Sequence, residues 1–168
     1  MLSEEALKAA GPSCEALHAY FMEQSVNGVD DIHAKVDASY FESDGELSIT
    51  VGFNDMYDLF NLDSLNISLL RCWTLRMKKQ TEEMHCNGGF LDPQQPSGSM
   101  LCGFYVALNM LDLLGDISIL KKASDYKVPI GRANQGALRM VQGMLCEFIL
   151  KEIVDPKGKF FDGPADNP

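Results

Sequence analysis

The residue with the clearest potential for chemistry is Cys102, which stands where a polar loop rich in Gly and Pro meets an apolar segment of helix length. Ser99 has the side chain of a helix N-cap. The segment from Cys102 to Leu114 is apolar on nearly all sides, as a buried helix is, and Gly115 ends it. A thiol in the first turn of a helix faces unpaired N–H groups and the positive end of the helix dipole. Both favour the thiolate, the form of cysteine that attacks carbonyl carbons.

A second interpretation of Cys102 is that it is a small buried apolar residue, the usual role of an intracellular cysteine. An unassisted thiol has a pKa of about 8.5, so only a few per cent of it is ionised at neutral pH. A helix N-terminus contributes about 0.3–1 kcal/mol toward the thiolate, which is less than one pKa unit. A nucleophilic Cys102 would therefore need a base from elsewhere in the chain.

Histidine is the natural base, and His85 is the histidine nearest to Cys102 in the sequence. His18 and His33 are interpreted as structural or surface residues, because nothing near them in the sequence indicates a ligand or a base. A metal site at His85, Cys86 and Cys102 fails because no CxxC or HxxxH spacing supports it. The chain is expected to hold no metal and no cofactor.

The run from residue 95 to residue 106 carries a resemblance to a known family. Its residues are QPSGSMLCGFYV. They resemble the nucleophile segment of the ubiquitin-like-protein (SUMO) protease family, or ULP proteases, in which a Gln lies a few residues before a Cys-Gly-aromatic-aromatic run that begins the central helix. More narrowly, the chain resembles the ULP-protease-like proteins that plant genomes carry in association with transposable elements. The resemblance implies that Cys102 is the nucleophile and Gln95 the side-chain donor of the oxyanion hole.

Three other stretches resemble the same family. They are residues 56–65 (MYDLFNLDSL), 89–93 (GFLDP) and 156–161 (PKGKFF). The resemblance implies one ULP-protease-like domain over residues 1–168, with an N-terminal helical part at 1–93. The part at 94–168 then holds the nucleophile loop, the central helix and a C-terminal helix. The expected fold class is a helix-dominated α+β fold, an incomplete papain-like cysteine-proteinase fold with a reduced sheet.

The chain departs from the family between Pro93 and Gln94, which are adjacent here. Family members carry at this place a block of strands that supplies a catalytic His and then an Asp or Asn. A deletion, a skipped exon or a truncated gene model would each explain its absence. Because a cysteine peptidase needs a base and then an acid for the leaving amine, the expected peptidase activity is very low or nil. A non-catalytic protein-binding module and an inert transposon-derived remnant remain alternatives.

Composition narrows the partners and the compartment. The chain has 168 residues, 46% of them hydrophobic and 23% charged, and a formal charge of −10, which argues against nucleic acid and anionic membranes as partners. Five scattered cysteines suit a reducing compartment, and no signal-peptide pattern is present. We expect an intracellular protein of the nucleus or cytoplasm, with the nucleus implied by resemblance alone. Its expected partner is a ubiquitin-like modifier or a conjugate of one.

Hydrophobic periodicity and breaker residues predict the elements around Cys102. The predicted helices lie at about 3–10, 12–26, 54–60, 65–84, 102–114 and 132–154. Alternation from Leu47 to Phe53 predicts a strand, for which the segment 38–42 is the expected partner. Asp30 to His33 is expected to form a loop or a helix start. The charged run from Arg76 to Glu83 is expected to be a solvated helix face.

Overall fold

The computed structural model describes residues 3–37, 40–41, 47–85, 102–115 and 135–163. Its elements are α1 (Glu4–Ala10), α2 (Pro12–Val26), β1 (Asp31–Val36), β2 (Leu47–Gly52), α3 (Phe53–Asn61), α4 (Ile67–Glu83), α5 (Cys102–Gly115), α7 (Gln135–Phe148) and the π-helix η3 (Ile149–Val154). The fold is therefore a helix-dominated α+β fold, as predicted.

The helices begin and end at residues whose chemistry favours those places. The Ser3 hydroxyl accepts a hydrogen bond from the first turn of α1, and Gly11 ends that helix with a φ of 89° that favours glycine. Pro12 then opens α2, where its missing N–H is no loss. The predicted cap of α4, Asp63 or Ser64, is wrong: the Asn66 side chain accepts the hydrogen bond instead.

The strands β1 and β2 form an antiparallel pair that runs from Asp31 opposite Gly52 to Val36 opposite Leu47. The predicted strand at 47–53 is thus confirmed, but its predicted partner at 38–42 is wrong. The partner is β1, which includes the segment expected to be a loop or helix start. Alternate residues of β1 are buried, so its charged residues point outward and hide a strand pattern. The backbone N–H of Lys35 also donates to the Phe160 carbonyl, at 3.0 Å.

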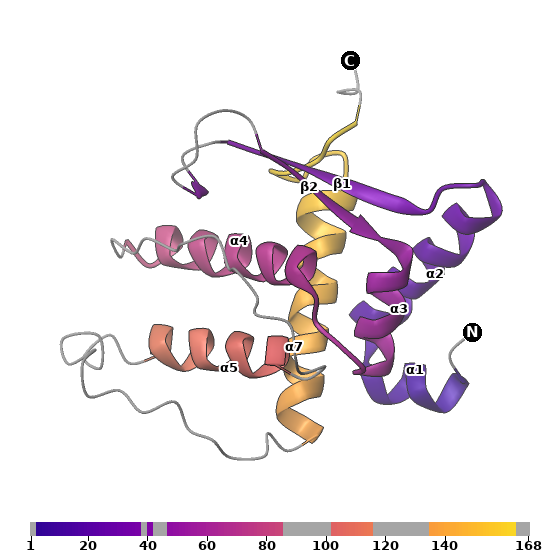
Figure 1. Cartoon of the computed structure of the whole chain (residues 1–168), viewed down its shortest axis with the longest axis horizontal. Coiled ribbons are helices and arrows are strands. Elements are labelled where there is room, and N and C mark those ends of the chain that lie inside the picture. The colour runs from indigo at the N-terminus through magenta and orange to yellow at the C-terminus, as the bar shows by residue number, and fades with distance from the viewer. Residues whose placement is uncertain (1–2, 38–39, 42–46, 86–101, 116–134, 164–168) are drawn as a thin grey trace.

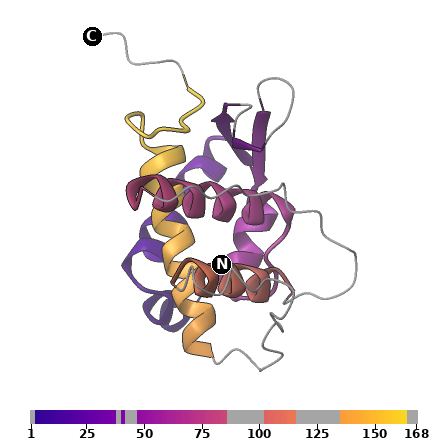
Figure 2. The same cartoon turned by 90° about the vertical axis from the view of Figure 1, so that its left-hand side faces the viewer.

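Helix α4 is the centre of the arrangement. Figures 1 and 2 show the two-stranded sheet on one side of α4 and α5 on the other, with α7 and η3 crossing both helices. Helices α1, α2 and α3 pack together on the side of α7 that faces away from α4 and α5 (Figure 1). The face of α4 predicted to point inward is buried, as its fully enclosed Trp73 illustrates. This burial gives the helix its stability, since charged residues occupy much of its last two turns.

The C-terminal helix is one continuous rod that changes its hydrogen-bonding pattern near its end. It was predicted over 132–154, and the described part runs from Gln135 through α7 into η3 and ends at Val154. The chain then folds back, because the Phe160 N–H donates to the carbonyl of Glu152 at 2.8 Å. Gly158 permits this return, since a Cβ there would lie 2.5 Å from the Glu152 backbone. The buried amide of Gln142 also joins α7 to the end of α3 through the carbonyls of Leu59 and Phe60.

The first turn of α5 packs directly on the backbone before α4. A Cβ placed on Gly103 would lie 2.1 Å from the carbonyl oxygen of Leu65. No side chain larger than hydrogen fits that space, so glycine is required here by the close approach of two backbones. Phe104, the next residue, is fully buried, but Val106 on the same helix is 39% exposed, so the prediction that this helix is buried on nearly all sides is wrong. The start of α5 is therefore fixed in place against the start of α4.

Replacing Gly103 by Ala tests this contact. We expect Gly103→Ala to lower the free energy of unfolding by at least about 2 kcal/mol, because the added methyl meets a backbone atom that cannot rotate away. Urea unfolding followed by circular dichroism measures the change.

Gly143→Ala is the matched control, because Gly143 lies within α7 and a Cβ there meets nothing within 4 Å. It should raise stability by about 0.5–1 kcal/mol, the ordinary helix preference for Ala over Gly. Equal effects of the two substitutions would contradict the packing described here.

Candidate functional site

The structure places Cys102 as the first described residue of α5, which agrees with the predicted position of this cysteine at a helix start. The placement of its side chain lies outside what the structure describes, and so do Gln95 and Ser99. What the structure does describe is the support of this helix end. Gly103 sits on Leu65, and α4 and α5 begin at the same end and run side by side (Figure 1).

His85 does not lie at that end. It follows Met84, the residue that caps the far end of α4. The 17 residues of α4 span about 25 Å at the usual rise per residue. Because α5 starts against Leu65, at the beginning of α4, His85 stands a full helix length from the first turn of α5. His85 is therefore too far from the start of α5 to act as the base for Cys102.

His33 lies in β1, in the sheet that α4 separates from α5 (Figures 1 and 2). Its ring nitrogens meet Thr50 at 3.1 Å and Asp31 at 3.2 Å. Its side chain is 46% exposed, as expected for an outward position on a strand. His33 is a surface residue of the sheet, which agrees with its interpretation from the sequence.

His18 lies among aromatic rings between α2 and α3. Its ring centroid is 5.4 Å from that of Phe60 and 6.0 Å from that of Phe21. Burial lowers the pKa of His18, and the positive N-terminus acts in the same direction. A neutral imidazole packed edge-on against Phe60 fits a structural role. All three histidines of the sequence are thus located, and none is described in contact with the start of α5.

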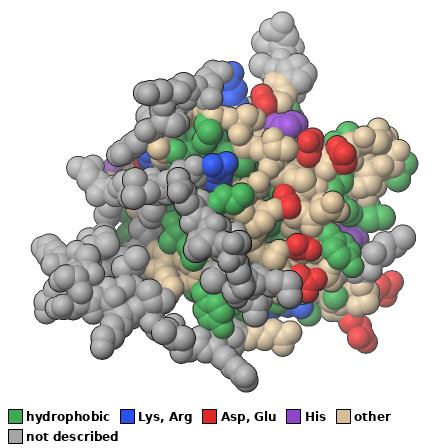
Figure 3. All heavy atoms as spheres, in the orientation of Figure 1, with side chains coloured by type: hydrophobic (Ala, Val, Ile, Leu, Met, Phe, Trp, Pro, Cys, Tyr) green, Lys and Arg blue, Asp and Glu red, His purple; other side chains and the backbone are tan. Residues whose placement is uncertain are grey.

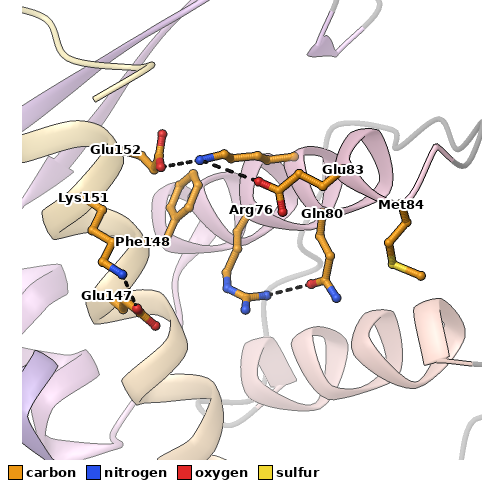
Figure 4. Close-up of a pocket in the computed structure, with 9 residues that line it drawn as sticks. Arg76, Gln80, Glu83, Met84, Glu147, Phe148, Lys151 and Glu152 are labelled. Atoms are coloured by element: carbon orange, nitrogen blue, oxygen red, sulfur yellow. Dashed lines mark hydrogen bonds and ion pairs between the residues drawn. The ribbon is translucent and has the colours of Figure 1, made fainter. Parts of the chain in front are cut away.

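A pocket of about 490 Å³ lies between α4 and the junction of α7 with η3 (Figure 4). Its lining residues are Arg76, Lys79, Gln80, Glu83, Met84, Glu147, Phe148, Lys151 and Glu152. The buried ring of Phe148 forms an apolar wall, and charged groups from both helices surround it. The pocket therefore joins an apolar surface to paired and unpaired charges.

The ion pairs of this pocket use most of its charged groups. Lys79 pairs with Glu152 and approaches Glu83 at 3.9 Å, and Lys151 pairs with Glu147 at 2.6 Å. Paired in this way, these groups largely neutralise one another.

Arg76 differs from the other cations of the pocket. Its guanidinium donates to the Gln80 amide at 3.2 Å and lies over the Trp73 ring, and it forms no ion pair with a carboxylate of the described residues. Burial lowers the pKa of Arg76, while the more distant charges of Glu147 and Glu83 act against that effect. A half-buried guanidinium with an amide as its partner is the group of this pocket that gains most from an incoming carboxylate.

Sequence reasoning missed this pocket because it interpreted the run from Arg76 to Glu83 as a solvated face. The spacing of Arg76, Gln80 and Glu83 places them on one side of a helix, which was a usable signal. The matching signal is the Glu147–Lys151 spacing on the C-terminal helix. That these two faces meet depends on the packing of α4 against α7, which no local pattern contains.

The remaining surface and composition of the described residues offer few other sites. Acidic side chains are spread over the part of the surface where α1, α2 and α3 lie (Figure 3). Within the described ranges no three His, Cys, Asp or Glu side chains are grouped so that they could hold a metal ion. None of the described helices combines the length and apolar character needed to cross a membrane.

Comparison of the chain with protein-family models, with curated proteins and with solved structures finds no match in any of the three. The two features of this chain that bear on its function are the start of α5 at Cys102 and the pocket around Arg76.

Proposed function

We propose that this protein is a ULP-type cysteine peptidase-like protein whose peptide-bond chemistry is very low or nil. Cys102 takes the nucleophile position and Gln95 the position of the oxyanion-hole donor, in an incomplete papain-like fold. The ancestral activity is the proteolytic release of ubiquitin-like modifiers. The observation that carries the proposal is the position of Cys102 at the start of α5, within the sequence run that resembles the family.

The close approach of Gly103 supports this proposal. In the Cys-Gly-aromatic-aromatic pattern, the glycine follows the nucleophile, and here it lets α5 begin against the backbone at Leu65. The aromatic residue that comes next, Phe104, is buried. The pattern thus has a packing reason in this chain, which holds the cysteine end of the helix in one place.

Among the residues that the structure describes, no histidine lies near the start of α5, and this accounts for the expected lack of peptidase chemistry. Hydrolysis requires a thiolate to attack the carbonyl carbon and an acid to protonate the departing amine, and one imidazole normally does both. His85 is a helix length away, His33 lies across α4, and His18 is packed against phenylalanine rings. A helix N-terminus alone lowers the pKa of a thiol by less than one unit, and it supplies no acid to protonate the departing amine.

Turnover of a modifier conjugate tests the proposal. A SUMO-type modifier joined through its C-terminus to a fluorescent amine should be cleaved no faster by the wild-type protein than by Cys102→Ala. A modifier carrying a C-terminal vinyl sulfone should likewise leave both proteins unlabelled. Cleavage or labelling by the wild-type chain that Cys102→Ala abolishes would show that a base reaches Cys102.

The genomic DNA between the codons for Pro93 and Gln94 provides an independent check. An in-frame segment there that encodes a His followed by an Asp or Asn would assign the missing block to a gene-model artefact. The restored chain should then cleave the conjugate. Directly adjacent codons would establish that the block is absent from the protein itself.

The pocket around Arg76 favours a second candidate function, a non-catalytic protein-binding module. Phe148 offers an apolar surface and Arg76 a half-buried cation whose described partner is an amide. A partner that brings a carboxylate beside an apolar side chain fits both. The ion pairs of Lys79 and Lys151 then frame the bound group without competing for it.

Titration of the labelled protein with a SUMO-type modifier, followed by NMR, tests this second function. Backbone signals of Arg76, Lys79 and Phe148 should shift, and Arg76→Met should weaken binding about tenfold or more, since a charged hydrogen bond is lost. Met keeps the apolar stem over Trp73. Lys157→Met, on the exposed turn after η3, is the control and should bind normally. Absence of shifts at high modifier concentration would remove this function.

A further inference from the structure

Two cysteines that are far apart in the sequence meet inside the fold. Cys14, on α2, and Cys146, on α7, have their Sγ atoms 3.0 Å apart, and both side chains are fully buried. Helices α2 and α7 pack against each other. The two thiols are separated by 132 residues of sequence, so only the packing of these helices brings them together.

We propose that Cys14 and Cys146 form a reversible dithiol–disulfide site that a small hydroperoxide oxidises and that joins α2 to α7. The sulfurs already lie within hydrogen-bonding distance, so a bond between them requires an approach of about 1 Å. At this distance no other atom separates the two sulfurs, and because both are fully buried the peroxide reaches them through local opening of the packing. The site is independent of Cys102 and of the proposed peptidase ancestry.

The surroundings divide the two roles of the reaction between the two sulfurs. The hydrogen bond between the two sulfurs lowers the pKa of Cys14, and the charge of Arg139 adds to this against the opposing effect of burial. The same hydrogen bond and burial raise the pKa of Cys146. The positive charge of Arg139 acts on Cys14, so in this proposal Cys14 is the sulfur that becomes a thiolate first and Cys146 attacks second.

The reaction balances with hydrogen peroxide as the oxidant. The Cys14 thiolate attacks one peroxide oxygen, the O–O bond breaks, and a sulfenic acid forms as hydroxide leaves and takes up a proton. The Cys146 sulfur then attacks the Cys14 sulfur as it loses its proton, the S–O bond breaks, and a second water departs. Two thiols and one peroxide give one disulfide and two waters, with two electrons passing from sulfur to oxygen.

Cys72 provides a comparison within the same fold. It is also fully buried, on α4, and burial raises the pKa of its thiol to about 12. It therefore stays protonated and unreactive at neutral pH. All three cysteines are buried, so burial does not distinguish Cys72 from the other two. What distinguishes Cys14 and Cys146 is that their sulfurs lie next to each other.

Peroxide treatment of the folded full-length chain, followed by alkylation in denaturant and tryptic mapping, tests the proposal. Peptides 9–35 and 140–151 each contain one cysteine, Cys14 and Cys146 respectively, and should be recovered as a linked pair. Peptide 72–76, which contains Cys72, should be recovered alkylated. A peptide dithiol treated with peroxide in parallel shows that the concentration and the time of treatment are sufficient to form a disulfide. Recovery of Cys14 and Cys146 as thiols, or linked to other cysteines, would overturn the proposal.

Thermal unfolding gives a second readout. The oxidised chain should unfold about 5 °C or more above the reduced chain, because the crosslink restricts the unfolded state. Dithiothreitol should reverse the rise. Cys14→Ala and Cys146→Ala are matched variants, because each keeps a small apolar residue in the core and removes one sulfur. Neither should show the rise, and an equal rise in either variant would assign the effect to another oxidation.

Discussion

The structure depends most on the approach of the Gly103 backbone to the carbonyl of Leu65. This contact sets the first turn of α5 against the residues that lead into α4, and it leaves room for no side chain at position 103. Because the two helices start at the same end, everything at the end of α4 is carried away from Cys102. One backbone contact thus fixes where this end of α5 stands and keeps it a helix length from His85.

The consequences extend through α4, which touches the sheet, α5 and α7 on different faces. The sheet face carries His33 away from α5, and the α7 face forms the pocket around Arg76. The proposed loss of peptidase chemistry and the proposed retention of a protein-binding pocket are therefore two outcomes of the same arrangement.

Local sequence signals were enough to predict most of the helices and strands, but not which of them pack against one another. Gly11 and Pro12 marked the break between two helices, and alternation marked β2, because these effects act over a few residues. The partner of β2 was missed because β1 begins with Asp31 and shows its buried positions only in register with β2. The position of Cys102 at a helix start was predictable from its flanking pattern. The Arg76 pocket and the Cys14–Cys146 pair were not, since each joins distant segments.

The rate at which iodoacetamide alkylates Cys102, measured against pH in a Cys86→Ser background, tests the central claim most directly. A thiol with a helix N-terminus and no imidazole partner should react in a single step whose midpoint lies between about pH 7.5 and 8.5. A rate that is already on a plateau below about pH 7 would reveal a thiolate–imidazolium pair and contradict the account.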